Sequence, residues 1–162
     1  MKTAIYPGTF DPITLGHIDV IKKSLKIFDN VVVAATDNID KNYFFSLEDR
    51  LSIIEKSLFA DLKLNKKKIK VISFDTLTID LCKKYKASVI IRGLRAVSDF
   101  EYEFQLAGMN KQLNAKIETI FLMSDVENQI ISSKFVKEIS KLGGGISKFV
   151  TKSTAKMLKN KF

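Results

Sequence analysis

Residues 6–17 read YPGTFDPITLGH, and this segment organises the rest of the chain. A short apolar strand, expected at Thr3–Tyr6, enters a Pro/Gly turn, and the turn enters an amphipathic helix expected at Gly16–Phe28. The helix repeats apolar side chains at spacings of three and four residues, which places them on one face. The first N–H groups of a helix have no intrahelical partner and carry the positive end of its dipole. The junction therefore predicts an anion-binding site.

His17, the only histidine of the chain, falls in the first turn of this helix. The local positive field disfavours an imidazolium, so we expect a neutral ring that donates one hydrogen bond. A histidine that only caps the helix or packs locally would fit the same spacing. His17 is therefore a candidate for contact with a bound anion.

The rest of the chain alternates short β-rich runs with helical patterns, which is typical of an α/β fold with a parallel sheet. Strands are expected at Thr3–Tyr6, Val31–Thr36, Ile69–Phe74, Ser88–Arg92 and Ile117–Leu122. Helices are expected at Gly16–Phe28, Ser46–Phe59, Thr76–Tyr85, Ser98–Leu113, Ser133–Lys141 and Ile146–Asn160. Strands such as VVVAA are apolar on both faces, so helices should cover the sheet on two sides. We predict one domain over residues 1–162, a doubly wound five-stranded parallel sheet of the Rossmann-like type with C-terminal helices.

The charge balance suggests an anionic partner. Twenty-seven basic and eighteen acidic side chains give a formal net charge of +9, which suits nucleic acid, a membrane surface or a phosphorylated small molecule. The lysine clusters at residues 63–70 and 148–161 do not interleave exposed aromatic side chains of the kind that single-strand binders use, so nucleic acid is disfavoured. No apolar run approaches the roughly 20 residues that span a bilayer. The single cysteine, Cys82, suits buried packing in a reducing cytoplasm.

Polar side chains gather where the predicted strands end. Lys41 follows the second strand, Arg92 ends the fourth with Arg95 just beyond it, and Ser132 and Ser133 begin a helix after the fifth. Ligands of doubly wound sheets bind at the carboxyl ends of the strands, where the strand order reverses. Together with the histidine described above, these cations and donors predict a site for several phosphates.

Other phosphate-binding and metal-binding patterns do not match. GGGISK, at residues 143–148, follows a helix and lacks the spacing of a P-loop, which favours a helix–helix turn. The chain has no GxGxxG motif, so a dinucleotide-dependent oxidoreductase is disfavoured. One histidine and one cysteine disfavour a zinc site, and no protein-held metal is expected.

The segments TLGH (residues 14–17) and IRGLRAVSDFEYE (residues 91–103) closely resemble those of the bacterial phosphopantetheine adenylyltransferase family. The resemblance runs from Ile5 to about Leu142, with the same order of motifs. TxGH alone is moderately specific, because class I aminoacyl-tRNA synthetases share the related HxGH signature. The full set, with YPGTFDPITLGH, Lys41 and a late ISS, is very specific. The resemblance implies the fold of the HUP-type nucleotidylyltransferase superfamily.

The resemblance implies a reaction. The family transfers the adenylyl group of ATP to 4′-phosphopantetheine, which gives dephospho-CoA and pyrophosphate in coenzyme A biosynthesis. Reversible in-line attack without a covalent intermediate is implied, with Mg²⁺ accompanying ATP. A cytoplasmic homohexamer, with dephospho-CoA and CoA as product or feedback ligands, is also implied.

The resemblance also assigns roles to residues. His17, Lys41 and Arg92 are the implied catalytic residues, and His17 is expected to stabilise the transition state. Thr9 joins Lys41 and Arg92 at the acceptor phosphate, and Thr78 is expected to touch the pantetheine arm. The residues implied to bind ATP are Thr9, Phe10, His17, Gly93, Leu94, Arg95, Glu103, Asn128, Gln129, Ile130, Ile131, Ser132, Ser133 and Lys134.

Three residues depart from the family's pattern. Tyr43 stands where proline is common, which predicts a less rigid loop around Lys41. Asn128 replaces a commonly aromatic residue and Lys134 replaces a hydroxyl, which leaves the ATP contacts of that loop open. Two alternatives also stay open: a related nucleotidyltransferase with another acceptor, such as nicotinate mononucleotide or a sugar or polyol phosphate, and a basic RNA- or DNA-binding module.

Overall fold

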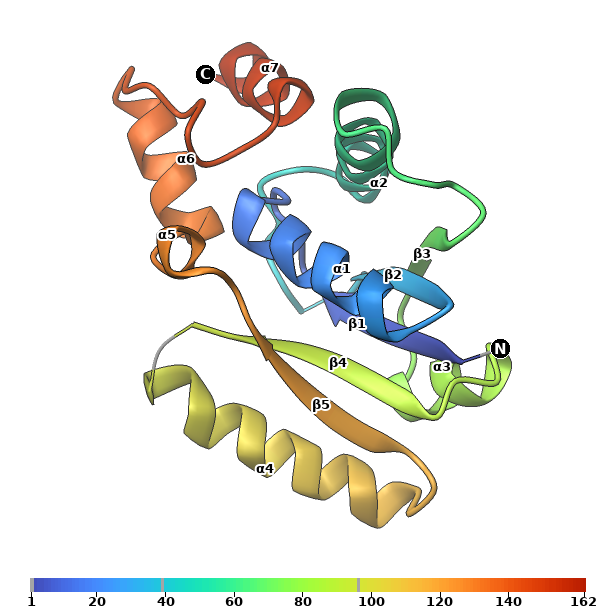
Figure 1. The fold of residues 1–162 in the computed structure, drawn as a ribbon. Helices are drawn as coiled ribbons and strands as arrows, with labels where there is room; N and C mark the ends of the chain where they lie inside the picture. Colours follow the sequence, from blue (N-terminus) through green and yellow to red (C-terminus); the bar gives the residue numbers. More distant parts are fainter. Residues whose placement is uncertain (1, 39, 96) are drawn as a thin grey trace.

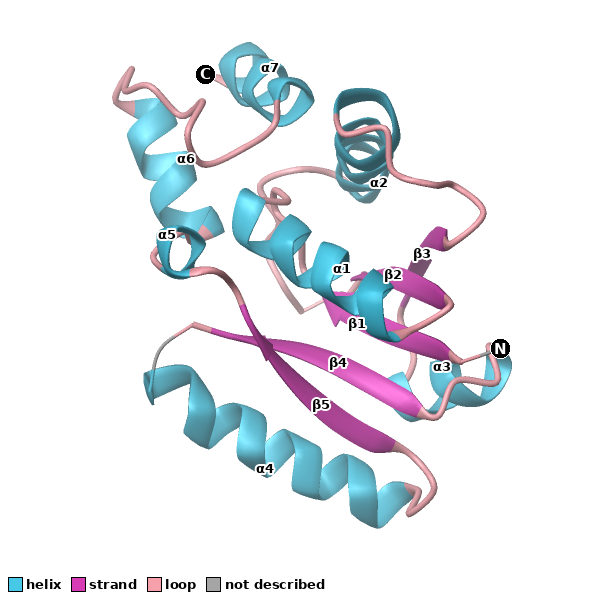
Figure 2. Cartoon of the chain, viewed as in Figure 1, coloured by secondary structure: helices cyan, strands magenta, loops and turns pink. Residues whose placement is uncertain are grey.

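The computed structural model describes residues 2–38, 40–95 and 97–162. At its centre lies a five-stranded sheet in the order β3-β2-β1-β4-β5, with every neighbouring pair parallel (Figures 1 and 2). The strands are β1 (Thr3–Gly8), β2 (Asn30–Thr36), β3 (Ile69–Phe74), β4 (Val89–Leu94) and β5 (Glu118–Met123). The strand order reverses between β1 and β4. The predicted doubly wound parallel sheet is confirmed.

Helices cover both faces of the sheet. One face packs against α1 (Leu15–Ile27), α2 (Leu47–Glu55), the π-helix η1 (Lys56–Asp61), α6 (Ser133–Lys141) and α7 (Lys152–Lys161). The other face carries α3 (Thr78–Lys84) and α4 (Val97–Leu113), as right-handed crossovers require, while α5 (Val126–Gln129) is a short turn of helix beyond β5. Along β1, Ala4 and Tyr6 join one core cluster and Ile5 joins the other. No helix within the described ranges is long and apolar enough to cross a membrane.

Most of the expected elements are confirmed, with ends displaced by one or two residues. Ser46 caps α2 by accepting the N–H of Asp49 at 3.1 Å. The single helix expected at Ser46–Phe59 is divided, because α2 ends at Glu55 and continues as η1. Cys82 is fully buried in the cluster under α3, and burial raises the pKa of its thiol to about 11. The packing role expected for this cysteine is confirmed.

The helix expected at Ile146–Asn160 is wrong in its first part. Helix α7 begins only at Lys152, where Thr151 caps it. The carbonyl of Phe149 accepts the N–H of Leu15, the first residue of α1, at 2.9 Å, so this carbonyl is hydrogen-bonded to α1 and not within a helix of its own. The residues before Thr151 instead form a turn that buries Ile146 and Val150, and their helical apolar spacing reflects that turn.

The glycine-rich segment at residues 143–145 links two helices. Gly143 has a φ of +77°, a left-handed conformation that glycine adopts without strain and that commonly follows the last turn of a helix. The residues that follow Gly143 in the chain connect α6 to the turn that precedes α7. The predicted helix–helix turn is confirmed.

Candidate active site

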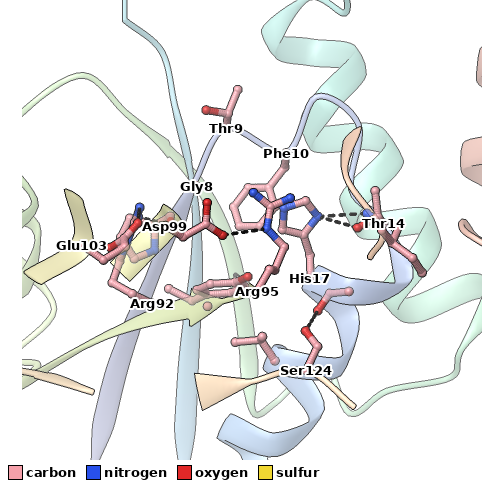
Figure 3. A pocket seen from close by; sticks show the side chains of 16 residues that line it. Gly8, Thr9, Phe10, Thr14, His17, Arg92, Arg95, Asp99, Glu103 and Ser124 are labelled. Atoms are coloured by element: carbon pink, nitrogen blue, oxygen red, sulfur yellow. Dashed lines mark hydrogen bonds and ion pairs between the residues drawn. The ribbon is translucent and has the colours of Figure 1, made fainter. Parts of the chain in front are cut away.

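A cavity of about 260 Å³ opens at the carboxyl ends of β1 and β4, where the strand order reverses (Figure 3). Doubly wound sheets bind their ligands at this position. The cavity, called the central cavity below, is lined by Tyr6, Pro7, Gly8, Thr9, Phe10, Thr14, Gly16, His17, Val20, Arg92, Gly93, Arg95, Asp99, Glu103, Ser124 and Ile131.

His17 enters the central cavity from the first turn of α1 (Figure 3). Its Nδ1 accepts the backbone N–H of Thr14 at 3.0 Å, and the Thr14 hydroxyl lies 3.0 Å from the same nitrogen. Because Nδ1 accepts, the ring proton resides on Nε2. Burial, assisted by the charges of Arg95 and Arg92, lowers the pKa of His17 to about 4. The ring is therefore neutral with one N–H donor, as the sequence predicted.

The start of α1 is more closed than the sequence predicted. The Leu15 N–H donates to the Phe149 carbonyl at 2.9 Å, and the Thr14 N–H donates to His17. These internal bonds occupy donors that were expected to bind an anion. The formal positive charge in the central cavity comes from Arg92 and Arg95 instead.

The depressed pKa of His17 predicts a specific pH dependence of stability. The folded-state value is about 4, against 6.5 for an exposed histidine, so between these values only the unfolded chain binds the proton. The stability contributed by neutral His17 is therefore lost as the pH falls from about 6.5 to about 4. Urea unfolding at about pH 7 and about pH 4.5 should show a larger acid-induced loss for the wild type than for His17→Gln. Equal losses would contradict the neutral, buried ring.

Phe10 fixes the ring of His17 by packing. It is 1% exposed, and its ring meets those of His17 and Tyr6 edge-on, with centroids 5.1 Å and 5.4 Å away. A side chain this buried can offer a nucleotide its backbone but little of its ring. Gly8 makes room for the ring, because a Cβ at Gly8 would lie 2.8 Å from Cζ of Phe10.

We therefore expect Gly8→Ala to destabilise the protein by about 1–3 kcal/mol, since Phe10 is confined by its neighbours and cannot move aside freely. Gly108→Ala is the matched control, because a Cβ there meets no heavy atom within 4 Å. Gly108 lies inside α4, so alanine should stabilise the fold by roughly 0.5–1 kcal/mol. Denaturant midpoints measure both effects, and equal shifts in the two variants would contradict the packing argument.

Arg92 and Glu103 form a planar, bidentate ion pair at the cavity wall. Arg92 Nε donates to Glu103 Oε2 at 2.7 Å, and Arg92 Nη2 donates to Oε1 at 2.6 Å. Arg92 Nη1 donates to the Pro7 carbonyl at 3.0 Å. Glu103 is 7% exposed, and both its oxygens are engaged. Because both oxygens of Glu103 accept hydrogen bonds from Arg92, this carboxylate is placed to orient Arg92 and not to contact ATP directly.

Arg95 also lines the central cavity and forms an ion pair of its own, with Asp99. Its Nε is 3.3 Å from Oδ2 of Asp99, one turn into α4. Gly93 lines the cavity nearby, where a Cβ would approach Val20 to 3.4 Å. Leu94 is not among the lining residues. Both arginines are thus oriented by carboxylates before any ligand binds.

A second hollow of about 480 Å³, called the loop cavity, is lined by Thr9, Asp11, Asp40, Lys41, Asn42, Tyr43, Ser133 and Lys137. Thr9 lines both cavities and stands between them. Asp11 accepts the N–H groups of Phe44 and Phe45 at 2.7 Å and 2.9 Å, and its Oδ2 lies 3.3 Å from Lys137 Nζ. Sequence reasoning missed Lys137, which adds a second ammonium to the cavity of Lys41.

Tyr43 connects the loop that carries Lys41 to Arg50 and Asn38. Its ring lies over the Arg50 guanidinium, with Cζ 3.9 Å from the ring centroid. Its hydroxyl accepts the N–H of Asn38 at 2.8 Å. The Tyr43 side chain thus ties this loop to Arg50, and the lower rigidity expected of the loop stays a prediction.

The segment at residues 128–134 reaches the site in part. Ile131 lines the central cavity and Ser133 the loop cavity, where the Ser133 hydroxyl donates to the Pro12 carbonyl at 2.8 Å. A Cβ at Gly16 would lie 3.2 Å from the Asn128 carbonyl, so this segment packs closely on the TLGH turn. The remaining residues implied for substrates line neither cavity, and their roles stay predictions: Thr78, Asn128, Gln129, Ile130, Ser132 and Lys134.

Fold and site agree on the class of protein. The T-x-G-H signature of nucleotidyltransferases opens α1, and α1 begins at the switch point of a doubly wound parallel sheet. Arginines and lysines line the two cavities at this end of the sheet, where doubly wound sheets bind their ligands.

Comparison with known proteins then defines the family. Residues 5–139 match the cytidylyltransferase-like family. The chain is 70% identical over 161 residues to the phosphopantetheine adenylyltransferase of Pelagibacter ubique (strain HTCC1062), which covers 99% of this chain and 98% of that protein. It is 49% identical over 162 residues to the protein of the same name from Cereibacter sphaeroides (strain ATCC 17025), with 100% and 99% covered. The chain belongs to the phosphopantetheine adenylyltransferases, a nucleotidyltransferase family of the cytidylyltransferase-like type.

A solved structure supports the fold assignment. It comes from Vibrio parahaemolyticus, is described as a candidate nicotinate-nucleotide adenylyltransferase, and superimposes with a TM-score of 0.69 at 20% identity. The match covers 98% of this chain and 91% of that one. At this identity the likeness concerns the fold.

Proposed function

We propose that the protein transfers the adenylyl group of ATP to 4′-phosphopantetheine, which gives dephospho-CoA and pyrophosphate in coenzyme A biosynthesis. Membership of the family supports adenylyl transfer. The observation that carries the proposal is the neutral His17, which shares the central cavity with two oriented arginines. Such a cavity can hold a polyphosphate and still place the uncharged N–H donor of His17 beside the oxygens of one phosphate group.

His17 acts as a hydrogen-bond donor. A group with a pKa of about 4 carries no acidic proton to deliver near neutral pH, and its Nδ1 is already occupied by Thr14. The acceptor phosphate is an anion at neutral pH and needs no base. The Nε2–H would stabilise charge that grows on the α-phosphate oxygens in the transition state. Positioning and electrostatics then account for catalysis without a covalent intermediate.

The two cavities suit the two substrates. The central cavity, with Arg95, would take the phosphates of ATP, and the loop cavity, with Lys41, would take the acceptor phosphate. Arg92, which the resemblance assigns to the acceptor phosphate, lines the central cavity and not the loop cavity, so it would contact the phosphates of ATP from there. Thr9 stands between the cavities and would contact both. The acceptor then approaches the α-phosphorus from the side opposite the departing pyrophosphate, as in-line attack requires.

Mg²⁺ is expected to arrive with ATP. Within the described residues no group of three or more His, Cys, Asp or Glu side chains is placed to hold a metal. The cavity carboxylates of Glu103 and Asp99 are paired with arginines. Mg²⁺ prefers phosphate oxygens and water with few protein ligands, so ATP would supply its main ligands and the chain would orient the complex.

Replacement of Lys41 by alanine is expected to raise the KM for phosphopantetheine about tenfold while the KM for ATP stays within about twofold, because one charge-assisted contact to the acceptor is lost. Lys67→Ala is the control, since it removes the same charge from an exposed position outside both cavities. Initial rates, with each substrate varied in turn at a saturating concentration of the other, give the KM for phosphopantetheine and the KM for ATP separately. A larger change for ATP would refute the assignment of the loop cavity.

The direct test of the function is pyrophosphate release with ATP, Mg²⁺ and a panel of acceptors. Turnover with 4′-phosphopantetheine is expected, and dephospho-CoA should appear in equal amount. Preference for nicotinate mononucleotide or a polyol phosphate would instead assign another acceptor.

A homohexamer, with CoA as a feedback ligand, is part of the proposal. Helix α4 leaves large apolar side chains in solvent in the single chain, with exposures of 49% for Phe100, 64% for Tyr102, 63% for Phe104, 63% for Met109 and 57% for Leu113. Apolar side chains gathered on one helix favour contact with another surface. Light scattering measures the mass, and a monomer would refute this part.

A further inference from the structure

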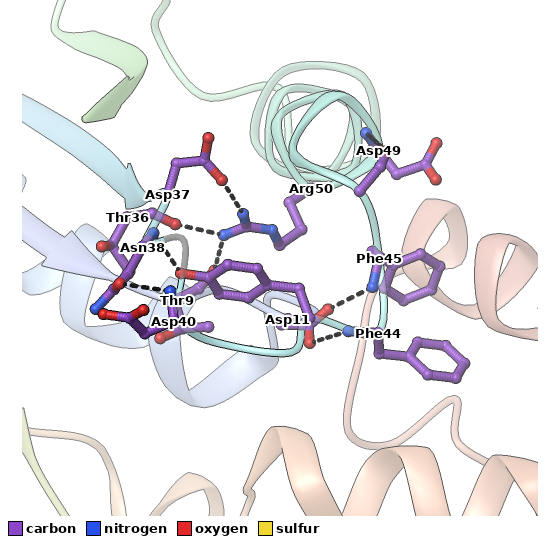
Figure 4. A network of polar contacts seen from close by, with 12 residues as sticks. Thr9, Asp11, Thr36, Asp37, Asn38, Asp40, Phe44, Phe45, Asp49 and Arg50 are labelled. Atoms are coloured by element: carbon purple, nitrogen blue, oxygen red, sulfur yellow. Dashed lines mark hydrogen bonds and ion pairs between the residues drawn. The ribbon is translucent and has the colours of Figure 1, made fainter. Parts of the chain in front are cut away.

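Arg50 is a buried cation that the proposed mechanism does not use. It is 0% exposed, and its Nη1 donates to the carbonyls of Thr9 and Thr36 at 2.9 Å and 2.8 Å (Figure 4). These carbonyls lie just beyond β1 and at the end of β2, so one guanidinium joins the carboxyl ends of two neighbouring strands. Its Nη2 lies 3.4 Å from Asp37 Oδ1.

The hydrogen bonding of Arg50 is incomplete. Among the described residues its Nε is the buried side-chain atom left without a partner. A buried cation with an unpaired donor costs stability compared with an apolar side chain of similar size. Packing alone therefore does not account for an arginine at this position.

Tyr43 completes the arrangement from the other side. Its ring covers the Arg50 guanidinium at 3.9 Å, and its hydroxyl accepts the Asn38 N–H at 2.8 Å. The Lys41 N–H donates to the Asn38 carbonyl at 3.1 Å, so Lys41 sits in a turn whose two sides are joined through Tyr43 and Asn38. Arg50 thus contacts both Thr9 and the base of the turn that presents Lys41.

We propose that Tyr43 and Arg50 are positioning residues that hold Lys41 and Thr9 in register for the acceptor phosphate. The proposal rests on the proposed function for the identity of the acceptor. The contact between the Tyr43 ring and the Arg50 guanidinium fixes the position of the turn that carries Lys41. The hydrogen bonds from Arg50 to the carbonyls of Thr9 and Thr36 fix the position of Thr9. Acceptor binding then requires little reordering of the loop.

Tyr43→Ala and Tyr43→Phe separate the stack from the hydroxyl in the full-length protein. Tyr43→Ala should raise the KM for phosphopantetheine about fivefold to tenfold, with the KM for ATP within about twofold. Tyr43→Phe loses the hydroxyl bond to Asn38 but retains the contact with Arg50, which the proposal makes the main constraint on the turn, so its KM for phosphopantetheine should stay within about twofold of the wild type. Arg50→Lys, which keeps the charge but loses the planar fork, should raise the KM for phosphopantetheine by a similar factor. The two KM values are compared in the Tyr43 variants, because Arg50 also holds Thr9, which lines both cavities.

A ligand-independent measurement separates failure of this proposal from failure of the proposed function. Amide hydrogen exchange at Lys41, Phe44 and Phe45 should be about fivefold faster in Tyr43→Ala than in Tyr43→Phe. If the wild type releases no pyrophosphate with phosphopantetheine, the function is refuted while the exchange rates still test the positioning. Equal exchange in the two variants, equal impairment of their acceptor KM, or a parallel rise in both KM values would overturn the proposal.

Discussion

Replacement of His17 by alanine is expected to lower kcat by about 10²–10³ with little change in either KM, the scale for losing one donor to a developing oxyanion. The reason is that His17 is neutral and its free nitrogen carries the only ring proton, so its contribution rises as negative charge grows in the transition state. Steady-state kinetics with saturating ATP and phosphopantetheine measures the effect.

His17→Asn is the matched variant, because an amide can keep a hydrogen-bond donor near the same place. It should recover part of the lost rate, whereas an unchanged kcat in His17→Ala would remove this residue from the mechanism. The pH profile of kcat/KM for the wild type, which reports groups of the free enzyme, should show no inflection from His17 above about pH 5.5, because its pKa lies near 4.

The second large effect is expected at Arg92. Arg92→Met should lower kcat/KM by about 10²–10³, because it removes one of the two guanidinium charges from the proposed phosphate site. It should also destabilise the fold by about 1–3 kcal/mol, because Glu103 loses both of its donors while 7% exposed.

The double variant Arg92→Met/Glu103→Gln distinguishes the two effects. Neutralising Glu103 removes the unpaired charge, so stability should return toward the wild-type value while activity should not. Recovery of activity in the double variant would show that repulsion by Glu103, and not loss of the guanidinium, caused the defect. Chemical denaturation and initial rates on the same preparations give both readings.

Local patterns in the sequence were sufficient for much of the fold. The strand at Ile69–Phe74 and the helix at Ser133–Lys141 have the predicted bounds, because apolar alternation and helix caps are local signals. The neutral state of His17 was predicted from its place in the first helical turn, whereas in the structure its main cause is burial, with the charges of Arg95 and Arg92. The start of α7 could not be predicted in this way, since Phe149 bonds to Leu15 from the far end of the chain.

The supporting residues of the site were harder to find. Arg50 stands three and four residues before the buried Ile53 and Ile54, so a charge at a core-facing helical position was the available signal. Nothing local indicated that its partners would be carbonyls of β1 and β2. Lys137 enters the loop cavity because α6 packs beside the turn after β1, a contact of residues far apart in sequence. The contacts of Tyr43 could not be predicted for the same reason, because they depend on Arg50.

The bond from the Leu15 N–H to the Phe149 carbonyl has a consequence for how the molecule is assembled. The helix that carries His17 is made early during synthesis, yet its first amide finds its partner only after five strands and the intervening helices have left the ribosome. Contacts between such distant segments are slow to form and are made late in folding. A nascent or truncated chain would therefore present an unfinished phosphate site, and the protein would gain its reactive geometry at the last stage of folding.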